Sequence, residues 1–190
     1  MNGRRVMKKW FLCILFGFFC MMMVPTTAYA SKKGQEKALV KAESYLKVGS
    51  YSKEGLQKQL KFDGFSNKEI DYAFKNLKAD WKKEAEKKAE SYLMADSYSK
   101  EELRSQLSFD KFTDKQIAYA IKHCGADWKQ QAKNKALYYL DSKDYSLESL
   151  QEQLVSDGFS KEQAGFGAKK AKAQKEAQKA SKKKKKKNKK

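Results

Sequence analysis

The chain has 190 residues and a formal net charge of +19 at pH 7, from 42 lysine and arginine residues against 23 aspartate and glutamate residues. Its single histidine excludes a zinc site built on several histidines, and two of its three cysteines, Cys13 and Cys20, lie within the first thirty residues. The single proline also lies there, so no proline interrupts a helix in the rest of the chain.

The first thirty residues predict a cleavable secretory signal peptide. Four basic side chains precede a stretch of fifteen apolar residues, 10–24, and the small residues Ala28 and Ala30 mark a cleavage site before Ser31. This stretch is shorter than the roughly 20 residues that a membrane-spanning helix needs, which favours cleavage over an uncleaved membrane anchor. Cleavage leaves Cys124 as the one cysteine of the mature chain, so packing rather than an internal disulfide must stabilise the fold.

Residues 33–173 form three tandem units of 47 residues each, at 33–79, 80–126 and 127–173. The third unit is partly degenerate at its end, where Gln174 and Lys175 stand in place of an Asp-Trp pair. The predicted repeat core consists of recurring apolar and aromatic residues: Tyr45, Leu46, Leu60, Phe65, Trp81, Tyr92, Leu93, Leu107, Phe112, Trp128, Tyr139, Leu140, Leu154 and Phe159. Because they recur periodically, we interpret the aromatic residues as core rather than as platforms for sugars or bases.

Each unit predicts three helices. The first places Ala85 and Ala89 on one face, the second carries Leu56 and Leu60 four residues apart, and the third repeats apolar residues at i, i+3, i+4 and i+7 over residues 70–77. An Asp-Gly-Phe sequence in the first and third units indicates a tight turn between the second and third helices. The predicted fold class is therefore all-α, with three tandem three-helix, helix-turn-helix-like repeats.

Sequence signals also mark the ends of these helices. In the capping box, a serine or threonine and a glutamate or glutamine three residues later satisfy free amides at the start of a helix. The pattern fits Ser66 with Glu69, Ser99 with Glu102, Thr113 with Gln116 and Ser160 with Gln163. In the second unit, Gly125 is suited to end the third helix in a left-handed conformation, and Asp127 to cap the next helix.

The units are expected to form a short, rod-like array. A unit of 47 residues is close to the size at which a single hydrophobic core becomes marginal, so we expect neighbouring units to pack on each other. Trp81 and Trp128 lie at the junctions, where a large aromatic side chain would add the most buried area. Separate beads on flexible linkers are disfavoured because no spacer rich in glycine, serine or proline divides the units.

The repeat resembles a known family. The pattern Ala-x-x-x-Ala-x-x-Tyr-Leu, Ser-x-x-x-Leu-x-x-Gln-Leu, Gly-Phe-Ser-x-x-x-Ile and Asp-Trp, best preserved from Ala85 to Trp128, is similar to that of the host cell surface-exposed lipoprotein (Ltp) family. The resemblance implies a compact three-helix module displayed outside the bacterial membrane. Some relatives are phage-encoded and are associated with superinfection exclusion, in which incoming phage DNA is kept out of the cell.

One feature departs from that family. A lipoprotein needs a small residue immediately before its lipidated cysteine, whereas Phe19 precedes Cys20 here. Cleavage after Ala30 would also remove Cys20, so lipidation is doubtful, and the lysine-rich end of the chain is a second candidate for surface retention.

The C-terminal residues 174–190 are predicted to be a disordered, lysine-rich tail. From residue 169 onward there are 13 lysines and one acidic residue, whereas residues 31–168 carry a net charge of only +3. We hypothesise that the tail binds polyanions, either wall teichoic acids or anionic lipid head groups, although a solvated tail with no partner is the alternative. The residues that would do so are Lys182, Lys183, Lys184, Lys185, Lys186, Lys187, Lys189 and Lys190.

The sequence gives only weak signals for a metal site, a catalytic site or specific DNA binding. Cys124 aligns with Leu77 and Ala171, which are core positions, so the adjacent His123 and Cys124 do not indicate a metal site or a nucleophile. Specific DNA binding is disfavoured because the body is nearly neutral and the signal peptide directs the chain out of the cell. No glycine-rich phosphate loop, nucleophile elbow or paired-carboxylate motif is present, so we predict no enzyme activity and no cofactor.

The sequence therefore predicts an exported, non-enzymatic protein at the cell surface whose helical repeats bind a protein partner. If the family resemblance extends to function, that partner belongs to the machinery by which phage DNA enters the cell. The alternative is a wall- or membrane-associated polyanion binder that acts through its lysine tail, with the repeats as a spacer.

Overall fold

The computed structural model describes residues 32–187, with side chains through residue 185. The predicted signal peptide with Ala28 and Ala30, and Ser31 after its cleavage site, lie outside the described residues, as do Lys189 and Lys190 and the side chains of Lys186 and Lys187. Within the described range every regular element is an α-helix, which confirms the predicted fold class.

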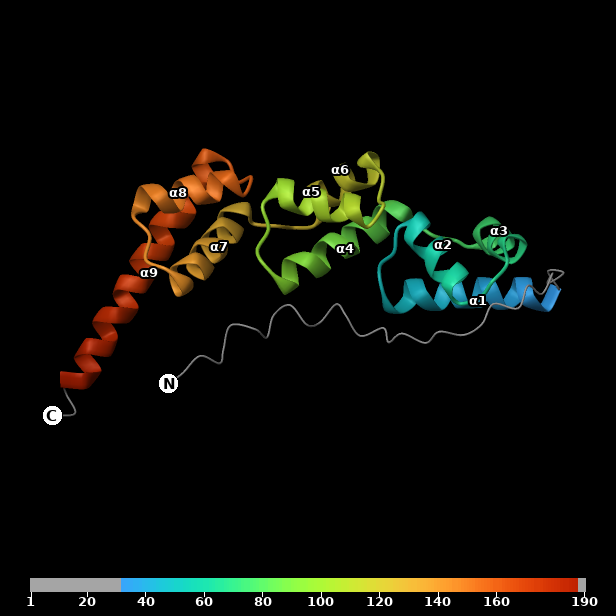
Figure 1. The fold of residues 1–190 in the computed structure, drawn as a ribbon, viewed down its shortest axis with the longest axis horizontal. Coiled ribbons are helices and arrows are strands. Elements are labelled where there is room, and N and C mark those ends of the chain that lie inside the picture. The colour runs from blue at the N-terminus through green and yellow to red at the C-terminus, as the bar shows by residue number, and fades with distance from the viewer. Residues whose placement is uncertain (1–31, 188–190) are drawn as a thin grey trace.

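The helices come in three sets of three, one set for each repeat (Figure 1). The first repeat contains α1 (Lys32–Val48), α2 (Lys53–Phe62) and α3 (Asn67–Asn76). The second contains α4 (Trp81–Ala95), α5 (Lys100–Phe109) and α6 (Asp114–His123). The third contains α7 (Trp128–Ser142), α8 (Leu147–Ser156) and α9 (Lys161–Lys187).

The helices begin where the sequence predicts. Reciprocal capping boxes start α3, α5 and α6, and the same pair of hydrogen bonds joins Ser160 and Gln163 at the start of α9. Asp127 caps α7 by accepting hydrogen bonds from two backbone amides, and Asp80 caps α4 in the same way. Gly125 has a φ of +65°, as expected for a left-handed residue after α6.

The turn between the second and third helices is a Schellman motif in every repeat. In the first repeat, the Gly64 amide donates to the Lys61 carbonyl and the Phe65 amide to the Leu60 carbonyl, at 3.0 and 3.1 Å. The residue after the helix cap has a positive φ: +90° at Gly64, +68° at Lys111 and +90° at Gly158. The second repeat therefore places a lysine in a conformation that favours glycine.

A tyrosine–aspartate hydrogen bond ties the long first helix of each repeat to this turn. The tyrosine hydroxyl donates to the aspartate Oδ2 at 2.7 Å in Tyr45–Asp63, 2.6 Å in Tyr92–Asp110 and 2.9 Å in Tyr139–Asp157. The aspartate is the C-cap residue of the second helix. The recurring tyrosine is thus both a part of the core and a polar link between helices that are far apart in sequence.

Each repeat encloses a hydrophobic cluster of its own. In each, the first helix packs extensively against the third, and the buried leucines of the second helix complete the cluster. The fourteen residues named as repeat core all lie within these three clusters or packed against them. Trp81 and Trp128 lie at the starts of α4 and α7 but pack against the cluster of the preceding repeat, so the tryptophans do bridge the junctions.

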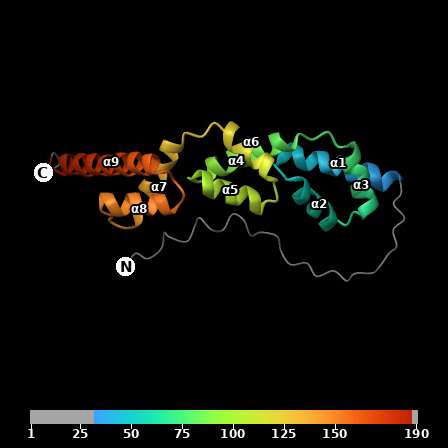
Figure 2. The ribbon, with the colours of Figure 1, turned by 90° about the horizontal axis from the view of Figure 1, so that it is seen from above.

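The repeats lie in a row, but their cores are separate (Figures 1 and 2). Neighbouring units do contact each other, as expected, but they do so through the tryptophans and through hydrogen bonds and an ion pair and not by merging their clusters. Each repeat closes its cluster with its own three helices, and apart from the tryptophans the contacts that join repeats are mainly polar, as described below. The rod-like arrangement itself is as expected.

The C-terminal segment differs from its prediction. Residues 174–187 were expected to be disordered, but α9 continues through them and projects beyond the third repeat (Figure 1). The buried residues Ala164, Ala168 and Ala171 anchor the first half of α9, and the alanine and lysine residues that follow have high helix propensity, so the helix propagates from a nucleus already formed. Among the described residues, no helix has the length and apolar character needed to cross a membrane.

Candidate binding groove between the first and second repeats

Buried serines join consecutive repeats. The Ser52 hydroxyl donates to the Asp110 carbonyl, and the Ser99 hydroxyl donates to the Asp157 carbonyl, both at 2.5 Å. Each serine is also the N-cap of its helix, accepting a hydrogen bond from the backbone amide three residues later. One side chain therefore starts the second helix of a repeat and attaches the next repeat to it, and both side chains are buried.

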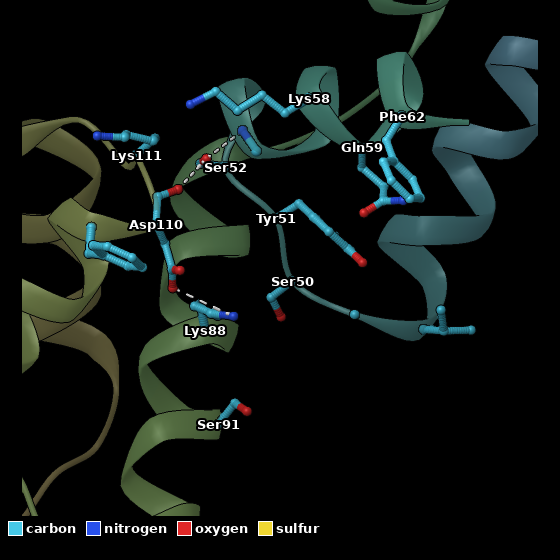
Figure 3. Close-up of a pocket in the computed structure, with 14 residues that line it drawn as sticks. Ser50, Tyr51, Ser52, Lys58, Gln59, Phe62, Lys88, Ser91, Asp110 and Lys111 are labelled. Carbon is cyan, nitrogen blue, oxygen red and sulfur yellow. Dashed lines mark hydrogen bonds and ion pairs between the residues drawn. The ribbon is translucent and has the colours of Figure 1, made fainter. Parts of the chain in front are cut away.

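A groove of about 900 Å³ opens beside the first of these junctions (Figure 3). Its lining includes the segment from Gly49 to Ser52 between α1 and α2. In Figure 3, Phe62 and Gln59 of α2 lie on one side, and Asp110 and Lys111 lie on the other. The site is thus built by two repeats together.

Three large apolar side chains line this groove and remain open to solvent. Val48 is 81% exposed, Phe62 is 74% exposed and Phe109 is 79% exposed. Phe62 and Phe109 end α2 and α5 and occupy the same position in consecutive repeats. Exposed apolar groups gathered in one depression are typical of a binding surface, whereas scattered single residues are not.

Three lysines and one aspartate supply the charge of the groove. Lys58 forms an ion pair with Glu54 at 2.7 Å, and Lys88 lies 3.5 Å from the Asp110 carboxylate. The hydrogen bond from Lys58, together with the charges of Lys58 and Lys111, lowers the pKa of the Glu54 carboxyl. The lining itself therefore carries more positive than negative charge.

The junction between the second and third repeats has the same scaffold but a different lining. There Lys135 of α7 crosses to Glu102 of α5 at 2.8 Å, and the Tyr98 amide donates to Gln131 Oε1 at 3.2 Å. Burial acts to lower the pKa of Lys135, but the hydrogen bond with Glu102 and the negative charges of Glu102 and nearby aspartates together outweigh that effect, and the pKa is raised. At the first junction Gly55 occupies the position of Glu102, so the equivalent lysine, Lys88, lacks this partner in the neighbouring repeat.

The other groove residues also change between the junctions. The positions of Lys58, Phe109 and Lys111 are taken by Ser105, Ser156 and Gly158 at the second junction. A Cβ atom on Gly158 would lie 2.8 Å from Glu101 Cβ, so the second junction is too close for any side chain there. The first junction accommodates a lysine at the equivalent position.

Sequence reasoning did not identify this groove. Its apolar residues are the last residues of their helices and lie off the buried helix faces, and its two walls come from different repeats. One signal was present: Phe62 and Phe109 recur at the 47-residue interval, yet neither lies on the predicted apolar face. A lysine in place of the turn glycine, at Lys111, was the second.

The structure places the other residues singled out from the sequence away from the groove. Cys124 is 8% exposed in the cluster of the second repeat, where burial raises the pKa of its thiol. His123 is exposed and stacks on Tyr119, with ring centroids 4.0 Å apart. Lys182 to Lys185 are exposed on the projecting part of α9. Among the described residues, no cluster of three or more histidine, cysteine, aspartate or glutamate side chains could hold a metal ion.

Comparisons with known proteins agree with the repeat pattern. The family model for host cell surface-exposed lipoproteins matches three segments, residues 33–77, 80–124 and 127–170. No curated protein matches the chain. A solved structure described as "Structure of Ltp, a superinfection exclusion protein from the Streptococcus thermophilus temperate phage TP-J34" is 39% identical, with 49% of this chain and 97% of that chain covered and a TM-score of 0.46. Because the family model matches well over half of its residues, this chain belongs to the host cell surface-exposed lipoprotein (Ltp) family.

Proposed function

We propose that this chain is an exported cell-surface protein that excludes superinfecting phage by binding a protein partner through its helical repeats. The match of all three repeats to a family described as host cell surface-exposed carries this proposal. Some members of that family are phage-encoded and are associated with superinfection exclusion. The partner is then a component of the machinery by which phage DNA enters the cell, and the repeats act without catalysis.

The groove at the first junction supports a binding role. Val48, Phe62 and Phe109 lie outside the hydrophobic clusters of the first two repeats. Large apolar groups left in water at a shared depression gain free energy when a partner covers them. The rigid helical scaffold on either side would hold these groups in place for that partner.

The lysine-rich end of α9 is proposed to attach the protein to the cell. Lys182 to Lys185 are exposed on a helix that projects away from the third repeat (Figure 1). Near an anionic membrane surface, each lysine contributes about 1 kcal/mol of attraction, and several act together. The alternative function is a polyanion binder in which this helix is the active part and the repeats are a spacer.

Infection of cells that display the protein tests the proposal. Phage should adsorb normally to cells that carry the full chain, while the entry of phage DNA and the efficiency of plating should fall. Normal DNA uptake in the presence of displayed protein would contradict the proposal.

A shortened chain separates the two functions. Ending the chain after residue 173 keeps the buried Ala171 and removes the projecting lysines. Under the proposed function, this chain should bind less to cell walls in a salt-dependent way but should still block DNA uptake when a lipid anchor restores its attachment. Loss of exclusion despite restored attachment would instead favour the polyanion binder.

A further inference from the structure

We infer that the groove between the first and second repeats binds an acidic segment of the partner protein that also carries apolar side chains. The identity of the partner rests on the proposed function, but the chemistry of the segment is argued from the groove alone. Three exposed apolar side chains, Val48, Phe62 and Phe109, line one depression of about 900 Å³. They require an apolar occupant to leave water.

The second junction shows that this lining is not a structural requirement. Both junctions are held by the same serine-to-carbonyl hydrogen bond, at Ser52 and at Ser99. The second junction forms with serine in place of Phe109 and of Lys58. Phe109, Lys58 and Lys111 are thus additions to a scaffold that forms without them at the second junction, where phenylalanine is kept only at the position of Phe62.

The backbone at Lys111 gives a second, independent indication. It is the one non-glycine residue with a positive φ, +68°, among the described residues, and it lies on the rim of the groove. Glycine occupies the equivalent positions 64 and 158 without strain. A strained lysine at a binding surface, where glycine would serve the fold better, indicates that its charge has a use.

The charge of the lining selects an acidic occupant. Lys58, Lys88 and Lys111 line the groove with one acidic residue, Asp110, and Glu54 pairs with Lys58, which leaves one net positive charge. At the second junction only the equivalent of Lys88, Lys135, is a lysine, and Glu102 neutralises it. Positive charge around an apolar centre is complementary to a segment with carboxylates beside leucine or aromatic side chains.

The shape favours a polypeptide over a membrane surface. The apolar residues line a depression between two repeats, and Tyr51 and Ser52 lie between its two sides (Figure 3). A bilayer presents a broad, flat face, whereas a chain segment can enter between the walls and contact both phenylalanines. Binding of the groove to anionic lipid is therefore the competing outcome of the test below.

Fluorescence anisotropy with labelled peptides tests the inference on the mature chain, Ser31–Lys190. One peptide alternates aspartate with leucine and phenylalanine, a second has lysine in place of aspartate, and a third has serine in place of the apolar residues. We expect only the first to bind appreciably. Equal binding of the lysine peptide would overturn the inference.

Groove variants take their residues from equivalent positions in the same protein, so their folding is already supported. We expect two double variants each to lower the affinity for the acidic peptide about tenfold or more, which corresponds to about 1.4 kcal/mol. One combines Phe62→Ser with Phe109→Ser, and the other combines Lys58→Ser with Lys111→Gly. The matched controls are Val40→Ser, which removes an exposed apolar side chain elsewhere, and Lys75→Ser with Lys122→Ser, which removes the same charge. Unchanged peptide affinity in both groove variants would sink the inference.

Two further readouts separate the alternatives. If the groove variants lose binding to phosphatidylglycerol vesicles but keep peptide affinity, the groove serves a lipid surface and the inference is wrong. Plating assays on cells that display the same variants distinguish a failure of this inference from a failure of the proposed function. A full chain that excludes no phage refutes the proposed function, whereas groove variants that exclude phage as well as the full chain does refute only the inference.

Discussion

At the scale of single residues, the recurring tyrosine has a structural role that accounts for its place in the repeat pattern. The Tyr139 hydroxyl donates to the Asp157 carboxylate at 2.9 Å, and the Gln153 amide holds the other carboxylate oxygen at 3.1 Å. Burial, followed by the hydrogen bond to Asp157, raises the pKa of Tyr139. The tyrosine, glutamine and aspartate of the motif thus form one network that joins the first helix to the turn after the second.

Replacing Tyr139 by phenylalanine should lower the free energy of unfolding by about 1.5–3 kcal/mol, the range for hydrogen bonds to charged groups. The reason is that Asp157 loses a donor while the ring remains in place. Urea unfolding followed by circular dichroism measures the change. Tyr138→Phe is the matched control, because Tyr138 is 58% exposed and should tolerate the loss of its hydroxyl. Equal losses in the two variants would contradict this role for Tyr139.

The raised pKa of Tyr139 also predicts how stability depends on pH. The folded protein holds the tyrosine proton more tightly than the unfolded chain does, so this contribution is fully present below the ordinary tyrosine pKa of about 10. It is lost as the pH rises from there toward the folded-state pKa. Unfolding measured between pH 9 and about 11 should show a steeper fall in stability for the native sequence than for Tyr139→Phe. Parallel curves would show that Tyr139 does not contribute.

Lys111 provides a test of strain at one residue. Lys111→Gly should raise the free energy of unfolding by about 1 kcal/mol, because glycine adopts the φ of +68° without a Cβ clash. Thermal unfolding would show the gain as a higher melting temperature. A loss of stability would mean that the charge of Lys111 supports the fold more than its backbone strains it.

At the scale of elements, a helix start and a repeat junction share one side chain. Ser99 caps α5 and donates to the Asp157 carbonyl of the next repeat, whereas Ser146 caps α8 in the last repeat and is exposed. In the first two repeats, this serine therefore both caps a helix and joins the next repeat, whereas in the last repeat it caps a helix and joins no further repeat. The helix ends are local features, but the junctions depend on how successive repeats meet.

Substitution of these serines separates the two roles. Ser146→Ala should cost about 1 kcal/mol, the usual loss of an N-cap. Ser99→Ala should cost about 2 kcal/mol, because it also leaves the Asp157 carbonyl without its hydroxyl partner. Chemical denaturation of the two variants side by side measures the difference. Equal effects would show that the bond between the repeats contributes nothing to stability.

At the scale of the whole molecule, two junctions with one scaffold have diverged. The second is closed by the Lys135–Glu102 ion pair, and the first has Gly55 at the position of Glu102. Lys88 therefore lies 3.5 Å from Asp110 of its own repeat, whereas Lys135 forms its 2.8 Å ion pair across the second junction. If the groove binds the segment inferred above, the first junction has a binding surface where the second has an additional ion pair, at some cost in stability.

Gly55→Glu tests that trade-off. A glutamate there would complete a capping box with Ser52 and reach Lys88, so the first repeat should gain about 1 kcal/mol of stability. Trp81 packs against the core of the first repeat, so its fluorescence can report the gain during unfolding. The same variant should bind the acidic peptide more weakly, because Lys88 is neutralised. Greater stability with unchanged peptide affinity would show that the charge of Lys88 does not contribute to binding in the groove.

Much of this protein could be predicted from its sequence because the decisive interactions are local. The 47-residue period, the capping boxes and the left-handed Gly125 join residues only a few positions apart, so helix starts and turns follow from residue type and spacing. The core residues could also be found, since a helix repeats its buried face at a known interval.

Only the tertiary structure decided how the repeats meet. The bonds at Ser52 and Ser99 join residues 58 positions apart, and residue types alone do not specify such a contact. The groove exists because Gly55 and Lys111 leave the first junction open, whereas Glu102 and Gly158 close the second. Local spacing determines which helices form, but the free energy of a surface between repeats depends on side chains brought together only after each repeat has folded.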